Sequence, residues 1–358
     1  MDPYYKEHQD PYGPGDVRPT ASHIIAVNGM HDKWQDKVVL ITGATGAIGL
    51  ETTIALLRTG AHIFITAHNE NEGQDAVEKI LNRCGPKARI DVLPLRMESL
   101  DSVKQAADEF LRRSPTLNVL INNAGIHEAP QALTMEGFES HFGINHLAHF
   151  TLITKLLPAL KAGSSSAFQS RIIQVSDDAH DLMPVDFDDV NFAKKRYIPF
   201  LAYAQSKTAM IWTANYVNTV YGPAGVHALS VNPGKVLSGH YQFLGPEWST
   251  SLTDGKGANM VKNPKQGAAT TVWAAVGKVW EGKGGVYLSD CRLSRCPPCF
   301  IDGLEGFHMR WTHDRKNEER LWRLSLECIG MAEPLIEGMT PSSHCNIPNL
   351  GLPVAMEE

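Results

Sequence analysis

The sequence predicts an α/β fold in which a doubly wound parallel sheet is covered by helices on both faces. Short apolar runs of strand length alternate with longer helical patterns between residues 37 and 290. The first apolar run leads into a glycine-rich turn and then into a helical pattern. Strands that alternate with helices pair in parallel, because each connecting helix crosses a face of the sheet. The steady alternation favours one domain over two in this chain of 358 residues.

Each element of the sheet is a short run rich in Val, Ile and Leu. The expected strands are Val38–Thr42, His62–Thr66, Ile90–Leu95, Val119–Asn122, Arg171–Val175, Val226–Val231 and Gly285–Leu288. The helical patterns between them include Leu50–Thr59, Ser102–Arg113, Met135–Leu160, Leu201–Val220 and Pro264–Val279. Ligands of such a sheet bind beside the carboxyl ends of the strands, where the glycine turn would lie.

Extensions are expected at both ends of this single domain, which is assigned to residues 35–290. Residues 1–34 are rich in Pro, Gly, His and Asp, so they are expected to form an arm that lies on the surface or is partly ordered. Residues 291–358 are expected to form an irregular loop and a C-terminal helix that packs on the core. Two long irregular stretches, Tyr241–Lys262 and Cys291–His313, are candidates for shaping a substrate pocket.

Composition and charge argue against several classes of partner. The net charge is −6 and no basic block occurs, so neither nucleic acid nor an anionic membrane is expected as a partner. No apolar run reaches membrane-spanning length, and the N-terminus lacks the apolar region of a secretory signal, so a cytoplasmic location is expected. Cys291, Cys296 and Cys299 lie near His308 and His313, but their spacing fits no common zinc pattern and no metal site is expected.

Tyr203 and Lys207 form the most informative pair for chemistry. They are four residues apart in a helical pattern, and residues at this spacing share one face of a helix. The ammonium of Lys207 can therefore lie near the phenol of Tyr203 and favour its ionised form. Such a phenol is a proton donor or acceptor that works near neutral pH.

Four further motifs accompany this pair in a fixed order. They are the strand and turn Val38–Gly49, the run Asn118–Gly125 that ends in Asn-Asn-Ala-Gly, the segment Phe142–Phe150, and Asn232-Pro233-Gly234. With these motifs in this order, the chain resembles the short-chain dehydrogenase/reductase superfamily over about residues 35 to 290. Within it, the chain is most similar to the retinol-dehydrogenase-like and WW-domain-oxidoreductase-like branch of the fungal metabolic type. The resemblance implies a Rossmann-type sheet, a nicotinamide cofactor and a small-molecule substrate.

The resemblance also implies a mechanism of hydride transfer. Tyr203 would give a proton to the oxygen of a carbonyl substrate, and alcohol oxidation would be the reverse. Lys207 would lower the pKa of Tyr203 and hold the nicotinamide ribose, and Asn145 would position a water that links Lys207 to solvent. The implied cofactor-binding residues are Tyr203 and Lys207 with Gly43, Thr45, Gly46, Ala47, Ile48, Gly49, His68, Arg96, Asn123, Ala124, Gly125, Pro233, Gly234 and Val236.

The sequence departs from the superfamily where a serine normally donates to the developing oxyanion. Relatives usually have two consecutive serines here and use the second, but this chain has Ser176 followed by Asp177. Three interpretations stay open: Ser176 takes over after a small shift of the loop, Asp177 donates as a protonated acid, or Asp177 is a general base. A fourth is that Asp177 turns toward solvent as an Asx-turn residue.

The residues that select the cofactor also differ from the pattern of the superfamily. The acidic residue that selects NAD is replaced by Ala67, and His68 stands where an arginine would bind the 2′-phosphate of NADP. Arg96 replaces an aspartate that contacts adenine, so it could reach a phosphate or cover the adenine pocket. Ala47 replaces the middle glycine of the turn, with Gly46 one place earlier. Together these residues favour NADP(H) over NAD(H).

Three hypotheses about function follow. The leading one is an NADP-dependent oxidoreductase, a carbonyl reductase or alcohol dehydrogenase, that acts on a mid-sized apolar molecule of secondary metabolism. The second is an enzyme of this fold that uses Asp177 in a non-redox or coupled isomerisation, dehydration, epimerisation or cyclisation. The third is a non-catalytic dinucleotide-binding scaffold. Helices such as 135–160 and 201–220 pair across two-fold axes in many relatives, so a homo-oligomer and a monomer both remain open.

Overall fold

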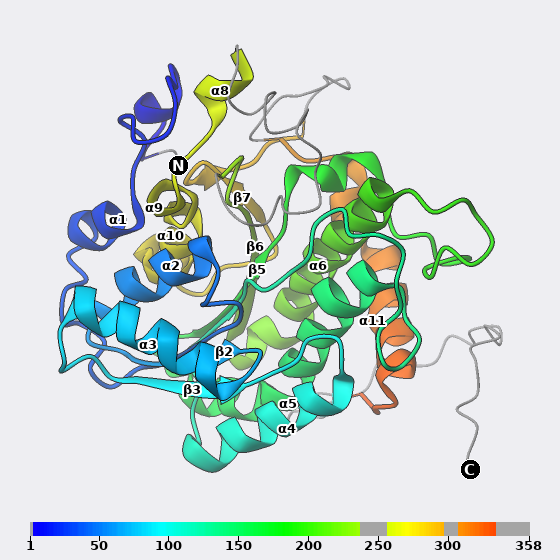
Figure 1. Cartoon of the computed structure of the whole chain (residues 1–358), viewed down its shortest axis with the longest axis horizontal. Coiled ribbons are helices and arrows are strands. Elements are labelled where there is room, and N and C mark those ends of the chain that lie inside the picture. The colour runs from blue at the N-terminus through cyan, green and yellow to red at the C-terminus, as the bar shows by residue number, and fades with distance from the viewer. Residues whose placement is uncertain (1–2, 237–255, 297–306, 334–358) are drawn as a thin grey trace.

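The computed structural model describes residues 3–236, 256–296 and 307–333 (Figure 1). Its centre is an eight-stranded sheet in the order β3-β2-β1-β4-β5-β6-β7-β8. All pairs are parallel except β7 with β8. The strands are β1 (Val38–Ile41), β2 (His62–Ala67), β3 (Ile90–Pro94), β4 (Val119–Asn122), β5 (Ser170–Val175), β6 (Val226–Asn232), β7 (Tyr287–Ser289) and β8 (Arg292–Leu293). The strand order reverses between β1 and β4, which confirms the predicted Rossmann-type α/β fold.

Helices cover both faces of the sheet (Figure 1). Alternate strand residues face opposite ways, so Leu40 packs in one apolar cluster while Val39 and Ile41 pack in the other. The first cluster is closed by α4 (Leu100–Arg113), α5 (Ala148–Gly163), α6 (Pro199–Tyr221) and α11 (Arg315–Ile329). The second is closed by α1 (Ala21–Val27), α2 (Ala47–Leu57), α3 (Glu70–Cys84) and α10 (Ala269–Val276).

Short helical elements connect these layers. They are η1 (Lys6–His8), the π-helical turn η2 (Phe142–Leu147), η3 (Asp178–Leu182), η4 (Gly222–Ala224), α8 (Lys256–Met260), α9 (Pro264–Gly267), η6 (Lys278–Trp280) and η7 (Arg310–His313). The turn η2 leads directly into α5 and carries Asn145. A π-helical turn inside a longer helix often marks a functional position.

The prediction that this helix begins at Met135 is wrong. Residues before Ser140 form a turn, with a bridge between Leu133 and Glu139. The buried carboxylate of Glu139 accepts the N–H groups of His141 at 2.9 Å and Phe142 at 2.8 Å, which caps the first helical turn. The apolar pattern continues upstream of this cap, and so it gave no signal of the true helix start.

The N-terminal segment is packed into the fold, in contrast to the expected surface arm. Ile24 of α1 and Trp34 are buried in the cluster shared with α2 and α10, and Figure 1 shows α1 beside these helices. The buried guanidinium of Arg18 donates to the carbonyls of Met260 at 2.7 Å and Val261 at 2.6 Å. The segment is polar in composition, but a few apolar side chains and one arginine suffice to anchor it.

The C-terminal helix α11 packs against α6. Trp322 is buried, and its ring stacks on that of Tyr216 of α6 with 4.5 Å between the ring centroids. Of the two long stretches expected to shape a pocket, residues 241–255 and 297–306 lie outside the described residues. The assignment of residues 35–290 as the catalytic domain stays a prediction.

Candidate active site

The glycine-rich turn joins β1 to α2 at the carboxyl edge of the sheet. Gly43 has a φ of +68°, which favours glycine, and a Cβ on Gly49 would lie 2.2 Å from the carbonyl oxygen of Gly43. These two glycines are therefore required by the turn's own backbone, whatever the ligand. No side chain caps α2 at Gly46, so the first N–H groups of α2 remain available to an anion.

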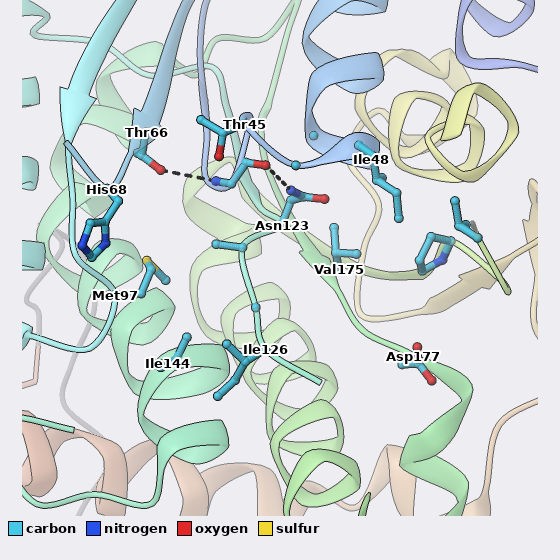
Figure 2. A pocket seen from close by; sticks show the side chains of 18 of the residues that line it. Thr45, Ile48, Thr66, His68, Met97, Asn123, Ile126, Ile144, Val175 and Asp177 are labelled. Atoms are coloured by element: carbon cyan, nitrogen blue, oxygen red, sulfur yellow. Dashed lines mark hydrogen bonds between the residues drawn. The ribbon is translucent and has the colours of Figure 1, made fainter. Parts of the chain in front are cut away.

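A cleft of about 400 Å³ opens beside this turn (Figure 2). His68 and Met97 lie toward one end, Asp177 lies toward the other, and Asn123 lies between them. The structure brings 17 of the 19 predicted site residues to its wall: Gly43, Thr45, Gly46, Ala47, Ile48, Gly49, His68, Asn123, Ala124, Gly125, Ser176, Asp177, Tyr203, Lys207, Pro233, Gly234 and Val236.

Sequence reasoning missed part of the lining. The missed residues are Thr66, Glu72, Leu95, Met97, Glu98, Ile126, Ile144 and Val175. Three of them, Thr66, Leu95 and Val175, lie at the ends of strands on the carboxyl edge or directly after them. Their position relative to the strands could have identified them, because every strand of the parallel sheet ends at this edge.

Arg96 does not line the cleft, so the structure does not support the interpretation that it covers the adenine pocket. Its side chain is exposed, and its backbone N–H donates to the hydroxyl of Ser102 at 3.0 Å. Arg96 lines a neighbouring hollow of about 380 Å³, and His68 lines both spaces. The next residue, Met97, lines the cleft instead.

Tyr203 and Lys207 lie at the wall of the cleft on α6, as their spacing predicts. The phenol of Tyr203 donates to Oδ2 of Asp177 at 3.0 Å. The ammonium of Lys207 lies 5.4 Å from the centroid of the Tyr203 ring and donates to the carbonyl of Val175 at 2.9 Å. The phenol of Tyr203, the ammonium of Lys207 and the carboxylate of Asp177 therefore lie together at the end of β5.

The charges in this group follow from burial and from its hydrogen bonds. Burial favours a raised pKa of Asp177, but hydrogen bonding to Asp178 and to the N–H of Ala179, together with the charge of Lys207, holds that pKa below its usual range. Burial lowers the pKa of Lys207 to about 8, although the charge of Asp177 opposes the shift. At neutral pH the site thus contains a carboxylate and an ammonium.

The structure bears on each interpretation of the serine and aspartate pair. Ser176 is buried, and its hydroxyl donates to the carbonyl of Lys207 at 2.9 Å, so this hydroxyl is already used. Oδ1 of Asp177 accepts the N–H of Ala179 at 2.9 Å, which is the contact of an Asx turn and caps η3, while Oδ2 accepts the phenol of Tyr203 at 3.0 Å. A lowered pKa does not fit a protonated donor at this position. The carboxylate is an acceptor in contact with the phenol.

Asn145 lies behind the cleft wall. Its side-chain oxygen accepts the N–H of Ile126 at 2.8 Å, and its amide group donates to the carbonyl of Ile126 at 3.0 Å and to the hydroxyl of Ser206 at 2.9 Å. These bonds use the side chain to hold the loop after β4. A role in linking Lys207 to solvent stays a prediction.

His127 is a further neighbour of Tyr203 that sequence reasoning missed. Its ring lies edge-on to that of Tyr203, with 4.3 Å between the centroids. Burial lowers its pKa to about 4, so this imidazole is neutral beside the phenol. No periodic pattern marks His127, because it lies in an irregular loop.

The described part of the chain contains neither a metal-binding cluster nor a membrane-spanning helix. Within it, no group of three or more His, Cys, Asp and Glu side chains is placed to hold a metal ion, and Cys299 lies outside it. None of its helices combines the length and apolar character that crossing a membrane requires.

Comparison with known proteins identifies the family of this chain. A sequence model described as short chain dehydrogenase matches residues 37–247. The chain belongs to the short-chain dehydrogenase/reductase family. Members of the family are oxidoreductases that use a nicotinamide dinucleotide, and the cleft beside the glycine turn is where such a fold binds one.

Several curated members of the family are similar over most of their length. The short-chain dehydrogenase/reductase prx1 of Penicillium roqueforti is 40% identical over 330 residues, covering 90% of this chain and 93% of that protein. The oxidoreductase calI of Penicillium decumbens is 38% identical over 340 residues, covering 92% and 98%. The human polyprenol dehydrogenase is 32% identical over 301 residues, covering 83% and 86%.

Solved structures share the fold of this chain. An uncharacterised protein of Mycobacterium paratuberculosis superimposes with a TM-score of 0.63 at 28% identity, covering 84% of this chain and 95% of that one. The angucycline C-6 ketoreductase LanV superimposes with a TM-score of 0.57 at 21% identity, covering 73% and 95%. These likenesses agree with the sheet order and the flanking helices described above.

Proposed function

We propose that this protein is an NADP-dependent oxidoreductase that interconverts a carbonyl group and a secondary alcohol. The observation that carries the proposal is the phenol of Tyr203 at the cleft wall, with the ammonium of Lys207 beside its ring. A bound nicotinamide dinucleotide supplies or accepts the hydride. The turn fits its pyrophosphate, because the uncapped start of α2 presents N–H groups to the cleft.

In this proposal, the residues of the chain handle the proton and the charge. Tyr203 gives its phenolic proton to the substrate oxygen as the hydride reaches the carbonyl carbon. Lys207 stabilises the resulting phenolate, and its buried ammonium makes this attraction stronger than it would be in water. Reprotonation of Tyr203 from solvent completes the cycle, and oxidation of an alcohol follows the same steps in reverse.

The proposed substrate is a mid-sized, largely apolar molecule of secondary metabolism. Ile126, Ile144 and Val175 line the cleft with apolar side chains (Figure 2). An apolar wall binds a ring or chain by burial, and a few polar groups then orient the reacting oxygen. The phenol of Tyr203 is the polar group that would donate to that oxygen, and Asp177 accepts from this phenol in the structure.

The preference for NADP rests on the residues at the end of β2. Ala67 offers no carboxylate to the ribose hydroxyls, and His68 lines both the cleft and the hollow that also contains Arg96. Glu72, also at the cleft wall, opposes this preference, because its carboxylate would repel a 2′-phosphate. We assign the preference to NADP because His68 and Arg96 together outweigh one carboxylate.

The change His68→Ala is expected to weaken NADPH binding about tenfold or more and to leave NADH binding unchanged. The imidazole can donate a hydrogen bond to the 2′-phosphate, and such a bond to a charged group contributes about 1.5 kcal/mol or more. Titration by nicotinamide fluorescence measures both constants. The control is His62→Ala, which removes a histidine from the other end of β2, where it pairs with Asp91. Equal loss of NADPH and NADH binding would contradict the assignment.

The reduction rate is expected to fall as the pH rises through about 8. Lys207 carries its proton below its lowered pKa of about 8 and loses it above, which removes the charge that stabilises the phenolate of Tyr203. Initial rates of NADPH-dependent ketone reduction from about pH 6.5 to 9.5 measure this effect. In Lys207→Arg, whose guanidinium stays charged, the decline should move to higher pH. A decline at the same pH in both proteins would assign it to another group.

One observation favours a second candidate function. An ionised Asp177 lies 3.0 Å from the phenol of Tyr203, where an oxyanion would be repelled. A carboxylate next to a phenol suits proton abstraction beside a carbonyl, as in isomerisation, dehydration or epimerisation. If purified protein converted such a substrate without oxidising or reducing the dinucleotide, this second function would replace the first.

A further inference from the structure

The loop after β4 forms one wall of the cleft and is held at two anchors. At its start, the hydroxyl of Thr42 accepts the N–H groups of Asn123 and Ala124, each at 2.9 Å. Further along, the side chain of Asn145 bonds to both the N–H and the carbonyl of Ile126, at 2.8 and 3.0 Å. Figure 2 shows Asn123 and Ile126 on this wall.

A buried histidine of α5 contacts both anchors. Nδ1 of His149 lies 2.8 Å from the carbonyl oxygen of Asn145, and Nε2 lies 2.9 Å from the hydroxyl oxygen of Thr42. A carbonyl can only accept, so Nδ1 carries the proton and Nε2 accepts the proton of Thr42. The hydroxyl of Thr42 then donates once and accepts twice, which uses its full capacity.

Burial determines the protonation state of the His149 imidazole. Burial lowers the pKa of its imidazole to about 3, in spite of the bond to the carbonyl of Asn145. The ring is therefore neutral at neutral pH, and its two bonds fix one tautomer. A neutral ring with a fixed tautomer holds the hydroxyl of Thr42 and the carbonyl of Asn145 at a fixed separation.

We propose that His149 is a positioning residue that joins the two anchors and so fixes the loop Asn123–Ile126 for the dinucleotide. The effect on the loop depends only on the contacts of His149 with Thr42 and Asn145. The effect on the dinucleotide also rests on the proposed function.

The same helical segment offers a matched control. His146 is 1% exposed and its Nε2 lies 2.8 Å from the hydroxyl of Ser325 on α11, which belongs to neither anchor of the loop. Burial lowers the pKa of His146 to about 3 as well. His146→Leu and His149→Leu therefore remove the same chemical group from equally buried positions, and only His149→Leu breaks the link between the anchors.

The experiment compares both variants with the wild-type protein by amide hydrogen exchange and by NADPH fluorescence titration. In His149→Leu, exchange at Asn123, Ala124 and Ile126 should be about tenfold faster than in His146→Leu, and the NADPH dissociation constant should rise about tenfold. His146→Leu should reduce thermal stability to a similar extent and leave both readouts at the wild-type level.

Two further variants keep one contact each. His149→Asn can still donate to the carbonyl of Asn145, and His149→Gln can still accept from Thr42. Each should protect one end of the loop, Asn the end at Ile126 and Gln the end at Asn123. Equal exchange rates in both leucine variants would overturn the proposal. If wild-type protein binds no dinucleotide, the proposed function fails, while the exchange data still decide the role of His149.

Discussion

The change Tyr203→Phe is expected to lower turnover by about 10²- to 10⁴-fold while leaving NADPH binding nearly unchanged. The phenylalanine ring fills the same buried space, so the only loss is the hydroxyl that donates to Asp177 and gives its proton to the substrate. Proton transfer by a positioned side chain contributes a rate factor of this size. Initial rates with aromatic and alicyclic ketones, together with nicotinamide fluorescence, separate the chemical step from binding.

The control for this change lies on the same helix. Tyr221 is also buried in α6, and its hydroxyl donates to Glu333 at 3.3 Å, remote from the cleft residues. Tyr221→Phe should retain wild-type turnover, although it also removes a buried phenolic hydroxyl. Full turnover in Tyr203→Phe would exclude this tyrosine as the acid and with it the leading function. A parallel loss in both variants would indicate damage to α6 and not to the proton transfer.

The fold could be predicted from the sequence because its signals are local. Each strand of the parallel sheet is a short apolar run in the sequence. The turn after β1 is marked in the sequence by Gly43 and Gly49. The start of the helix that carries Asn145 could not be predicted, because a buried carboxylate from outside the helix determines it. The burial of Arg18 depends on carbonyls more than two hundred residues away along the chain. Contacts between remote segments leave no periodic pattern.

The candidate site likewise combines features that local sequence patterns predict with features that depend on remote contacts. Spacing on α6 placed Tyr203 and Lys207 together, and strand ends placed Asn123 and Pro233 at the cleft. The position of Arg96 outside the cleft could not be predicted, because it depends on the path of an irregular loop. The charge of Asp177 could not be predicted either. Burial and hydrogen bonding shift its pKa in opposite directions, and only the geometry of η3 shows which effect is larger.

The change Asp177→Ser is expected to raise the reduction rate of simple ketones about ten- to a hundredfold. A carboxylate near the substrate oxygen repels the negative charge that develops there, by about 4 kcal/mol for charges 4 Å apart near a protein surface. A serine hydroxyl would donate to that oxygen, and each 1.4 kcal/mol recovered is a factor of ten. Oxidation of the matching alcohols should rise by the same factor in kcat/KM, because both directions share one transition state.

Two companion variants assign the cause. Asp181→Asn removes a carboxylate from the same η3 helix without touching Tyr203, so it should leave the rate unchanged. Asp177→Asn removes the charge and offers an amide donor of different length, so its rate should lie between those of wild type and Asp177→Ser. If both changes at Asp177 instead lower the rate with every ketone, the carboxylate takes part in the reaction. Its contact with Tyr203 would then be the basis of proton abstraction, and the second candidate function would follow from the same two atoms.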